Sequence, residues 1–207
     1  MVNEQVKYDF AFTGASMKYH DFMRLANYMA DHDFDPDATV LDPEEIMRRS
    51  NKRTSKREFQ EMIKRYRMLT TEQRRLIVDL DPNGQRQLAM IGLCKAHPFI
   101  KDFIIEAVRE KFISLDFKLT DGDYQSFLNR KMELHPELEQ FSDSTSKKAK
   151  QVTWRILEQA GLIDNTKDKI ILPQFVNQRV MDVLLEDDAN LLKIFLMTDH
   201  DIKLQRV

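Results

Sequence analysis

Apolar residues recur at three- and four-residue steps along most of the chain, and this spacing predicts a mainly helical protein. Residues 14–30 show the pattern first, and residues 70–80, 85–96 and 98–115 continue it, separated by the turn DPNG and by Pro98. We expect these helices to supply the central core. The apolar stripe of the first helix consists of Phe22, Leu25, Ala26 and Met29.

A helix-turn-helix is predicted in the first half. Asp42 can cap a short helix over residues 43–50, because Pro43 is tolerated at the first helical position. The basic turn NKRT follows, and Thr54 or Ser55 can cap the next helix. Two helices joined by so short a turn are typical of this motif. The apolar stripe of the second helix consists of Phe59, Met62, Ile63, Tyr66 and Leu69.

The sequence of the second half predicts a helix, a short helix, a turn and a long helix, in this order. Thr120 or Asp121 can cap a helix over residues 120–135, and Pro136 opens the short helix PELEQF. The turn SDS leads into the long helix, which Gly161 can end in the left-handed conformation. Residues 162–163 and 170–172 can then pair across the tip DNTKDK as a hairpin of the size of a wing. Two helices, over residues 173–185 and 188–197, close the chain.

These elements predict a mainly α fold, a helical bundle with helix-turn-helix elements and a small β wing. We divide the chain into an N-terminal helical domain, residues 1–117, with a basic helix-turn-helix, and a winged-helix-like C-terminal domain, residues 118–207. The tetrapeptides TSKR at 54–57 and TSKK at 145–148 suggest an internal repeat, although the two apolar stripes align best one residue off that register.

Composition is ordinary for a globular protein, with 42% hydrophobic and 32% charged residues. The net charge of −2 gives no support for nucleic-acid binding, so any such case depends on local charge. Local charge is uneven: residues 48–75 hold eleven lysines and arginines against three glutamates, whereas acidic residues gather in 31–45 and 186–188. Segregated charge of this kind can orient a protein on a polyanion.

Cysteine usage and hydropathy indicate a cytoplasmic protein. The single cysteine, Cys94, lies in the apolar run LAMIGLC, so we expect it in the core and expect no intramolecular disulfide. Residues 1–10 lack the basic-then-apolar layout of a signal peptide. No apolar stretch reaches the roughly 18 residues of a membrane span. We therefore expect no membrane partner.

The long helix of the second half has the two faces that a DNA-reading helix needs. Ala149, Val152, Ile156 and Ala160 form an apolar back, while Lys147, Gln151 and Trp154 fall opposite. Its hydroxyl- and lysine-rich start suits phosphate, because free backbone N–H groups and the helix dipole point there. In the first half, a further basic face points away from the apolar stripe. The expected DNA contacts are Arg53, Lys56, Arg57, Lys64, Arg65, Ser146, Lys147, Lys148, Lys150, Gln151, Arg155, Lys167 and Lys169.

Two structural alternatives stand beside this interpretation. Lysine-rich helix faces are mostly solvated surface, and these lysines can simply confer solubility. Trp154 is more readily explained by packing against the N-terminal half than by stacking on a nucleic acid.

Signals for an enzyme are weak. The five histidines are scattered without metal-ligand spacing, and there is no phosphate-cradling glycine loop or nucleophile elbow. The tripeptide Asp116-Phe117-Lys118 resembles an element of many nucleases, but that chemistry needs a strand-borne carboxylate partner and a metal site. We therefore expect no catalytic residue, no metal and no cofactor.

Several segments together resemble one family. KYDFAFTGASM, CKAHPFIKDFIIEAVREKF, HPELEQFSDSTSKKAKQVTWRILEQAGLI and LLKIF, in this order and spacing, are similar to BrxA, a component of BREX phage-defence loci. The resemblance spans nearly the whole chain. It implies a mostly helical fold with winged-helix character, binding to double-stranded DNA, and work alongside other BREX components; it implies no catalytic residue. An adapter between BREX proteins is the second interpretation, and a NusB-like RNA-binding protein is the third.

Overall fold

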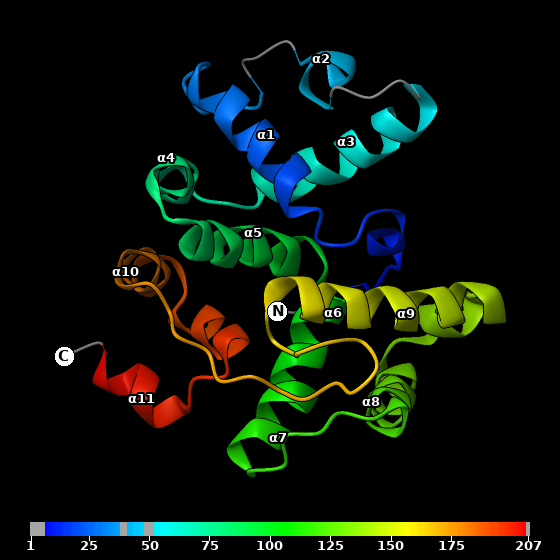
Figure 1. Ribbon diagram of the computed structural model, residues 1–207. Helices are drawn as coiled ribbons and strands as arrows, with labels where there is room; N and C mark the ends of the chain where they lie inside the picture. The colour runs from blue at the N-terminus through cyan, green and yellow to red at the C-terminus, as the bar shows by residue number, and fades with distance from the viewer. Residues whose placement is uncertain (1–6, 38–40, 48–51, 206–207) are drawn as a thin grey trace, which may run out of the picture.

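The structure is a computed structural model that describes residues 7–37, 41–47 and 52–205, with the backbone alone at 52–55. The chain is mainly helical, as predicted (Figure 1). The first half contains a 3₁₀ turn η1 (Ala11–Gly14) and helices α1 (Tyr19–Ala30), α2 (Pro43–Met47), α3 (Lys52–Arg67), α4 (Thr71–Asp79) and α5 (Pro82–Ala96).

Both helices of the predicted pair α2–α3 are present, but the predicted turn NKRT is wrong, because its last three residues belong to α3. Residues 48–51, which include the predicted end of the first helix, lie outside the described residues. Pro43 opens α2, as predicted, and Asp42 accepts a hydrogen bond from the Glu44 backbone N–H. The prediction that Thr54 or Ser55 caps the next helix is wrong, because α3 begins at Lys52 and contains both residues. Helices α2 and α3 contact each other and α1, and α3 crosses α5 so closely that a Cβ at Gly92 would lie 2.8 Å from the Arg65 carbonyl oxygen. A glycine is required at that crossing.

The middle of the chain is a continuous helical rod made of α6 (Pro98–Phe103), a π-helical turn η2 (Ile104–Val108) and α7 (Arg109–Ile113). The prediction that DPNG forms a turn is wrong, because Pro82, Asn83 and Gly84 belong to the first turn of α5. Asp81 caps α5 by accepting a hydrogen bond from the Gly84 N–H at 2.7 Å, and Pro82 occupies the first turn of that helix.

The second half follows the predicted order. Helix α8 (Asp121–Leu134) starts at a capping box between Thr120 and Asp123. A 3₁₀ helix η3 (Pro136–Gln140) and helix α9 (Asp143–Ala160) come next, and Gly161 ends α9 at φ 75° in the left-handed conformation. The chain closes with α10 (Gln178–Asp187), a 3₁₀ helix η4 (Ala189–Phe195) and α11 (Asp199–Leu204); the last of these was not predicted.

The predicted β wing is wrong as a sheet. The described residues contain only two isolated antiparallel bridges, Ile163–Ile171 and Lys118–Ile170. The two arms of the loop still pair as predicted, because the Asp164 N–H donates to the Ile170 carbonyl at 3.0 Å and the Leu172 N–H donates to the Leu162 carbonyl at 2.9 Å. Side chains hold the tip: Asp164 Oδ1 accepts from the Ile170 N–H at 2.8 Å, and Asn165 Oδ1 accepts from the Lys167 N–H at 2.8 Å. Local side-chain bonds of this kind compete with strand pairing.

One apolar cluster extends from Tyr8 to Ile202 and includes residues on both sides of residue 117. The N-terminal segment joins it through aromatic contacts, with Phe10 stacked on Phe141 at a centroid distance of 4.5 Å. Cys94 is fully buried, as predicted, and burial raises the pKa of its thiol. The division into two domains at residue 117 stays a prediction.

Candidate nucleic-acid interface

Helix α9 has the two faces that the sequence predicted. Ser142 caps it by accepting a hydrogen bond from the Thr145 N–H at 3.3 Å. Ala149 and Ile156 are fully buried against the core. The opposite face exposes Lys147, Lys148, Gln151 and Arg155, while Ser146 is half-buried. The first turn of α9 thus holds the Ser142 cap and the acidic Asp143, and the turn that follows exposes the cations Lys147 and Lys148.

Trp154 lies inside, although the helical wheel placed it on the outer face. It is 5% exposed and packs edge-on against Phe103 at 5.6 Å and tilted against Tyr124 at 5.9 Å. The interpretation that it packs against the N-terminal half is therefore supported, since Phe103 belongs to α6. The loop after α9 covers its other side, where the Lys169 ammonium lies 5.4 Å from the ring centroid.

Lys150 and Lys169 converge on one carboxylate. The Lys150 Nζ lies 2.9 Å from Asp121 Oδ2, and the Lys169 Nζ lies 3.5 Å from Asp121 Oδ1. The hydrogen bond from Lys150 lowers the pKa of Asp121. Lys150 also borders an open cleft of about 430 Å³ between α8, η3 and the start of α9, together with Ser146 and Lys147.

The predicted contacts of the first half differ in how exposed they are. Lys56 and Arg57 are exposed on α3, and the Arg57 guanidinium lies so close to Gly14 that a Cβ there would be 2.9 Å from Nη2. Lys64 is half-buried and pairs with Asp9 at 3.5 Å. The side chain of Arg53 lies outside the described residues. In the second half, Lys167 is exposed at the tip of the loop after α9.

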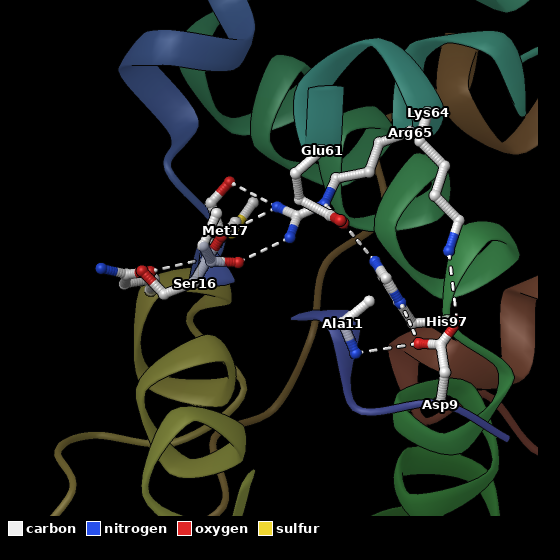
Figure 2. Close-up of polar contacts among 10 residues, drawn as sticks. Asp9, Ala11, Ser16, Met17, Glu61, Lys64, Arg65 and His97 are labelled. Carbon is white, nitrogen blue, oxygen red and sulfur yellow. Dashed lines mark hydrogen bonds and ion pairs between the residues drawn. The ribbon is translucent and has the colours of Figure 1, made fainter. Parts of the chain in front are cut away.

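Arg65 corrects the sequence prediction, because it is 1% exposed and points into the core rather than toward solvent. Figure 2 shows its guanidinium directed at the backbone of residues 15–17, where it donates to the carbonyl oxygens of Ala15 at 2.6 Å and Ser16 at 2.8 Å. Its Nε donates to Glu61 Oε1 at 3.0 Å. Its Nη1 also donates to the Met17 carbonyl oxygen at 3.2 Å. Bonds to three carbonyls and a carboxylate leave the guanidinium no free face for a phosphate.

His97 extends this buried polar cluster. Its Nε2 is hydrogen-bonded to the Glu61 carboxylate, and its Nδ1 lies 3.5 Å from Asp9 Oδ1 (Figure 2). Burial alone would raise the pKa of Glu61, but the hydrogen bond with His97 and the charge of Arg65 lower it to about 2. The nearby His97 ring likewise lowers the pKa of Asp9 to about 2. Sequence reasoning missed this cluster, whose only signal was a Glu–Arg pair at four-residue spacing beside the apolar stripe of α3.

The basic ends of two helices lie on the same side of the molecule. In Figure 1 the N-terminal ends of α3 and α9 are both on the right, and η1, in dark blue, lies between them. Contacts of η1 with both helices agree with this view. The loop of residues 162–171 also extends to this side, below α9.

An apolar groove of about 480 Å³ lies next to the bridged loop, between the end of α7 and residues 170–173. Leu115 at its edge is 76% exposed and has a left-handed backbone with φ 60°. A non-glycine residue in this conformation is strained, so the fold holds an apolar side chain outward at a cost. The groove is lined by Phe112, Leu115, Phe117, Ile170, Ile171, Leu172 and Pro173.

Neither a metal cluster nor a membrane-spanning element is found in the described part of the chain. Within it, no three or more His, Cys, Asp or Glu residues gather as ligands for a metal ion. None of its helices combines the length and the apolar character needed to cross a bilayer.

The fold and this surface define a mainly helical protein that exposes basic helix starts on one side. The family model for BrxA matches residues 6–188, and the chain therefore belongs to the BrxA family. The BREX protein BrxA of Escherichia coli O9:H4 (strain HS) is 28% identical over 148 residues, covering 69% of this chain and 68% of that protein. The BREX protein BrxA of Bacillus cereus (strain H3081.97) is 30% identical over 87 residues, covering 42% and 44%.

A solved structure supports the fold. The crystal structure of an uncharacterized protein from Magnetospirillum magneticum matches with a TM-score of 0.75 at 19% identity, covering 93% of this chain and 99% of that chain. At this identity the likeness shows the fold alone.

Proposed function

We propose that the protein is a non-enzymatic, double-stranded DNA-binding component of a BREX phage-defence system, acting with other BREX proteins in the cytoplasm. The observation that carries the proposal is the start of α9, where Lys147 and Lys148 are exposed in the turn that follows the capped N-terminus. Backbone phosphates bind to such a helix end through charge and N–H donors. The BrxA family membership agrees with the defence role.

The order of elements around α9 supports a winged-helix-like function. Helix α7 is followed by the bridge at Lys118, then α8, α9 and the bridged loop that ends at residue 172. In winged-helix proteins a helix in the position of α9 enters the major groove and the following loop contacts the neighbouring backbone. Lys167 at the exposed tip of the loop suits that second contact.

Duplex binding by a charge-deleted variant tests the proposal. We expect Lys147→Ala with Lys148→Ala to weaken binding across unrelated duplexes and to reduce the slope of log affinity against log salt by about two. The matched control is Arg179→Ala with Lys203→Ala, which removes two exposed cations from α10 and α11 on the left of Figure 1. Equal affinity of the two double variants for the duplex would show that Lys147 and Lys148 are not part of the DNA-binding surface.

The apolar groove favours a second candidate function, an adapter between BREX proteins. Its apolar lining fits a hydrophobic segment of a partner protein. In a pull-down with the other BREX proteins, Leu115→Asp should lose the partner while duplex binding stays unchanged; retention of the partner would exclude this groove as its docking surface.

An RNA-binding role ranks third. Single-stranded RNA as competitor separates it, because flexible RNA and duplex DNA present different phosphate geometry and base access. Preference for the RNA would favour this third function over the first.

A further inference from the structure

Two lysines on the DNA-facing side share a single acidic partner. Lys150 comes from α9, Lys169 comes from the loop after α9, and Asp121 is the first residue of α8. The Lys150 ammonium faces one oxygen of the carboxylate at 2.9 Å, and the Lys169 ammonium faces the other at 3.5 Å. The carboxylate thus bridges two cations that belong to separate elements.

The fold fixes the direction of Lys169. Its backbone is left-handed at φ 56°, its N–H donates to the Asn165 carbonyl at 3.1 Å, and its carbonyl accepts from the Leu119 N–H at 3.0 Å. Its side chain is only 16% exposed and lies against the buried ring of Trp154. A strained backbone and an aromatic wall together leave the ammonium few directions to point.

Asp121, in contrast, is easily displaced. Its side chain is 55% exposed, and the capping box of α8 uses Thr120 and Asp123 instead, so the helix keeps its cap when Asp121 turns away. Exposed ion pairs contribute little free energy, so another anion can take the place of the carboxylate.

We propose that Lys150 and Lys169 form a phosphate subsite of the DNA interface, which Asp121 occupies in the unbound protein and leaves when a backbone phosphate binds. This inference rests on the proposed function, because the phosphate belongs to the duplex. A phosphodiester carries one negative charge and two non-bridging oxygens, so it can face the two ammonium groups as the carboxylate does. Asp121 then keeps the two lysines together before binding and weakens binding by competing for them.

A double-mutant cycle tests whether a phosphate replaces the Asp121 carboxylate between the two lysines. We expect Asp121→Asn to bind a short duplex about two- to fivefold more tightly than the wild-type chain, since the cations no longer have to release a partner. In the background Lys150→Gln with Lys169→Gln, the same change should bring no gain. An equal gain in both backgrounds would show a general effect of lost negative charge and overturn the subsite, as would no gain in the wild-type background.

Inorganic pyrophosphate tests the subsite without DNA. The only tryptophan, Trp154, lies against Lys169, so its emission should report a change at that ammonium. We expect a saturable change in the wild-type chain, at lower pyrophosphate in Asp121→Asn, and none in the double Gln variant. If pyrophosphate saturates but no duplex binds, the proposed function fails and the anion subsite stands. If Asp121→Asn shows no saturable change, the subsite itself is overturned.

Discussion

Helices α3 and α9 look alike in sequence and differ in what the fold does with their charge. Each begins with a hydroxyl- and lysine-rich stretch and carries an apolar stripe. In α3, Arg65 is buried among carbonyls and Lys64 pairs with Asp9. In α9, Lys147 and Lys148 stay exposed. Part of the charge of α3 is therefore paired with the N-terminal segment, whereas these two lysines of α9 are exposed to solvent.

The neighbours of each helix explain the difference. The N-terminal segment covers helix α3. Residues 15–17 of this segment lie outside the helices, so their carbonyl oxygens need hydrogen-bond donors from elsewhere. The guanidinium of Arg65 supplies them. The start of α9 has an open cleft beside it instead. A count of basic residues along the sequence therefore overestimates the exposed charge of α3 more than that of α9.

Removing the buried guanidinium of Arg65 should have the largest effect, and it tests whether the charge of α3 stabilises the fold. Arg65→Met should destabilise the protein by about 3–5 kcal/mol, because it leaves several buried carbonyls without their donor and the buried Glu61 carboxylate without the charge of the guanidinium. Urea unfolding measures the change. The control on the same helix, Lys56→Met, is exposed and should stay within about 0.5 kcal/mol. A loss below about 1 kcal/mol in Arg65→Met would mean that water replaces the guanidinium and that the cluster is not structural.

Glu61→Gln should lower the free energy of unfolding by less than Arg65→Met does, and the size of this loss should depend on pH. The pKa of Glu61 is lowered to about 2 from an ordinary value of 4.5, so its contribution is complete above that ordinary value and is lost as the pH falls toward 2. We expect a loss of about 2–3 kcal/mol at neutral pH that shrinks in strong acid. Urea unfolding at neutral pH and near pH 3 checks this. A loss independent of pH would point to packing rather than charge.

The ends of the two helices provide a smaller contrast. Helix α3 ends where Arg74 donates to the carbonyl of Arg67 at 2.9 Å, whereas α9 ends at Gly161 with φ 75°. Gly161→Ala should destabilise the protein by about 1 kcal/mol, because an added Cβ meets open space but the left-handed backbone is strained for alanine. Thermal unfolding measures it, and an unchanged midpoint would show that the helix end relaxes.

The smallest expected effect is on the stability of α9 itself. Lys147→Ala with Lys148→Ala should shift the free energy of unfolding by no more than about 0.5 kcal/mol, because both side chains are exposed. Urea unfolding of the same samples used for DNA binding gives this value. A loss near that of Arg65→Met would remove the contrast between the two helices, since both would then use their charge for stability.

Local signals in the sequence determined most helices and several of their ends. The three- and four-residue spacing of apolar residues, Pro43, the cap at Thr120 and the left-handed end at Gly161 act within a few residues, and the structure confirms them. The BrxA family is also confirmed from the sequence. Such features depend on neighbours along the chain, so the sequence alone contains their physical cause.

Only the tertiary structure decided which polar groups face inward. Arg65 is buried because carbonyls about fifty residues earlier need donors, and Trp154 is buried because the loop after α9 covers it. The predicted wing is limited to two isolated bridges, and side chains of Asp164 and Asn165 bind the backbone of the loop. Lys150 and Lys169 meet through Asp121, which lies on a different helix. Burial and pairing are set by atoms distant in sequence, and a helical wheel contains none of them.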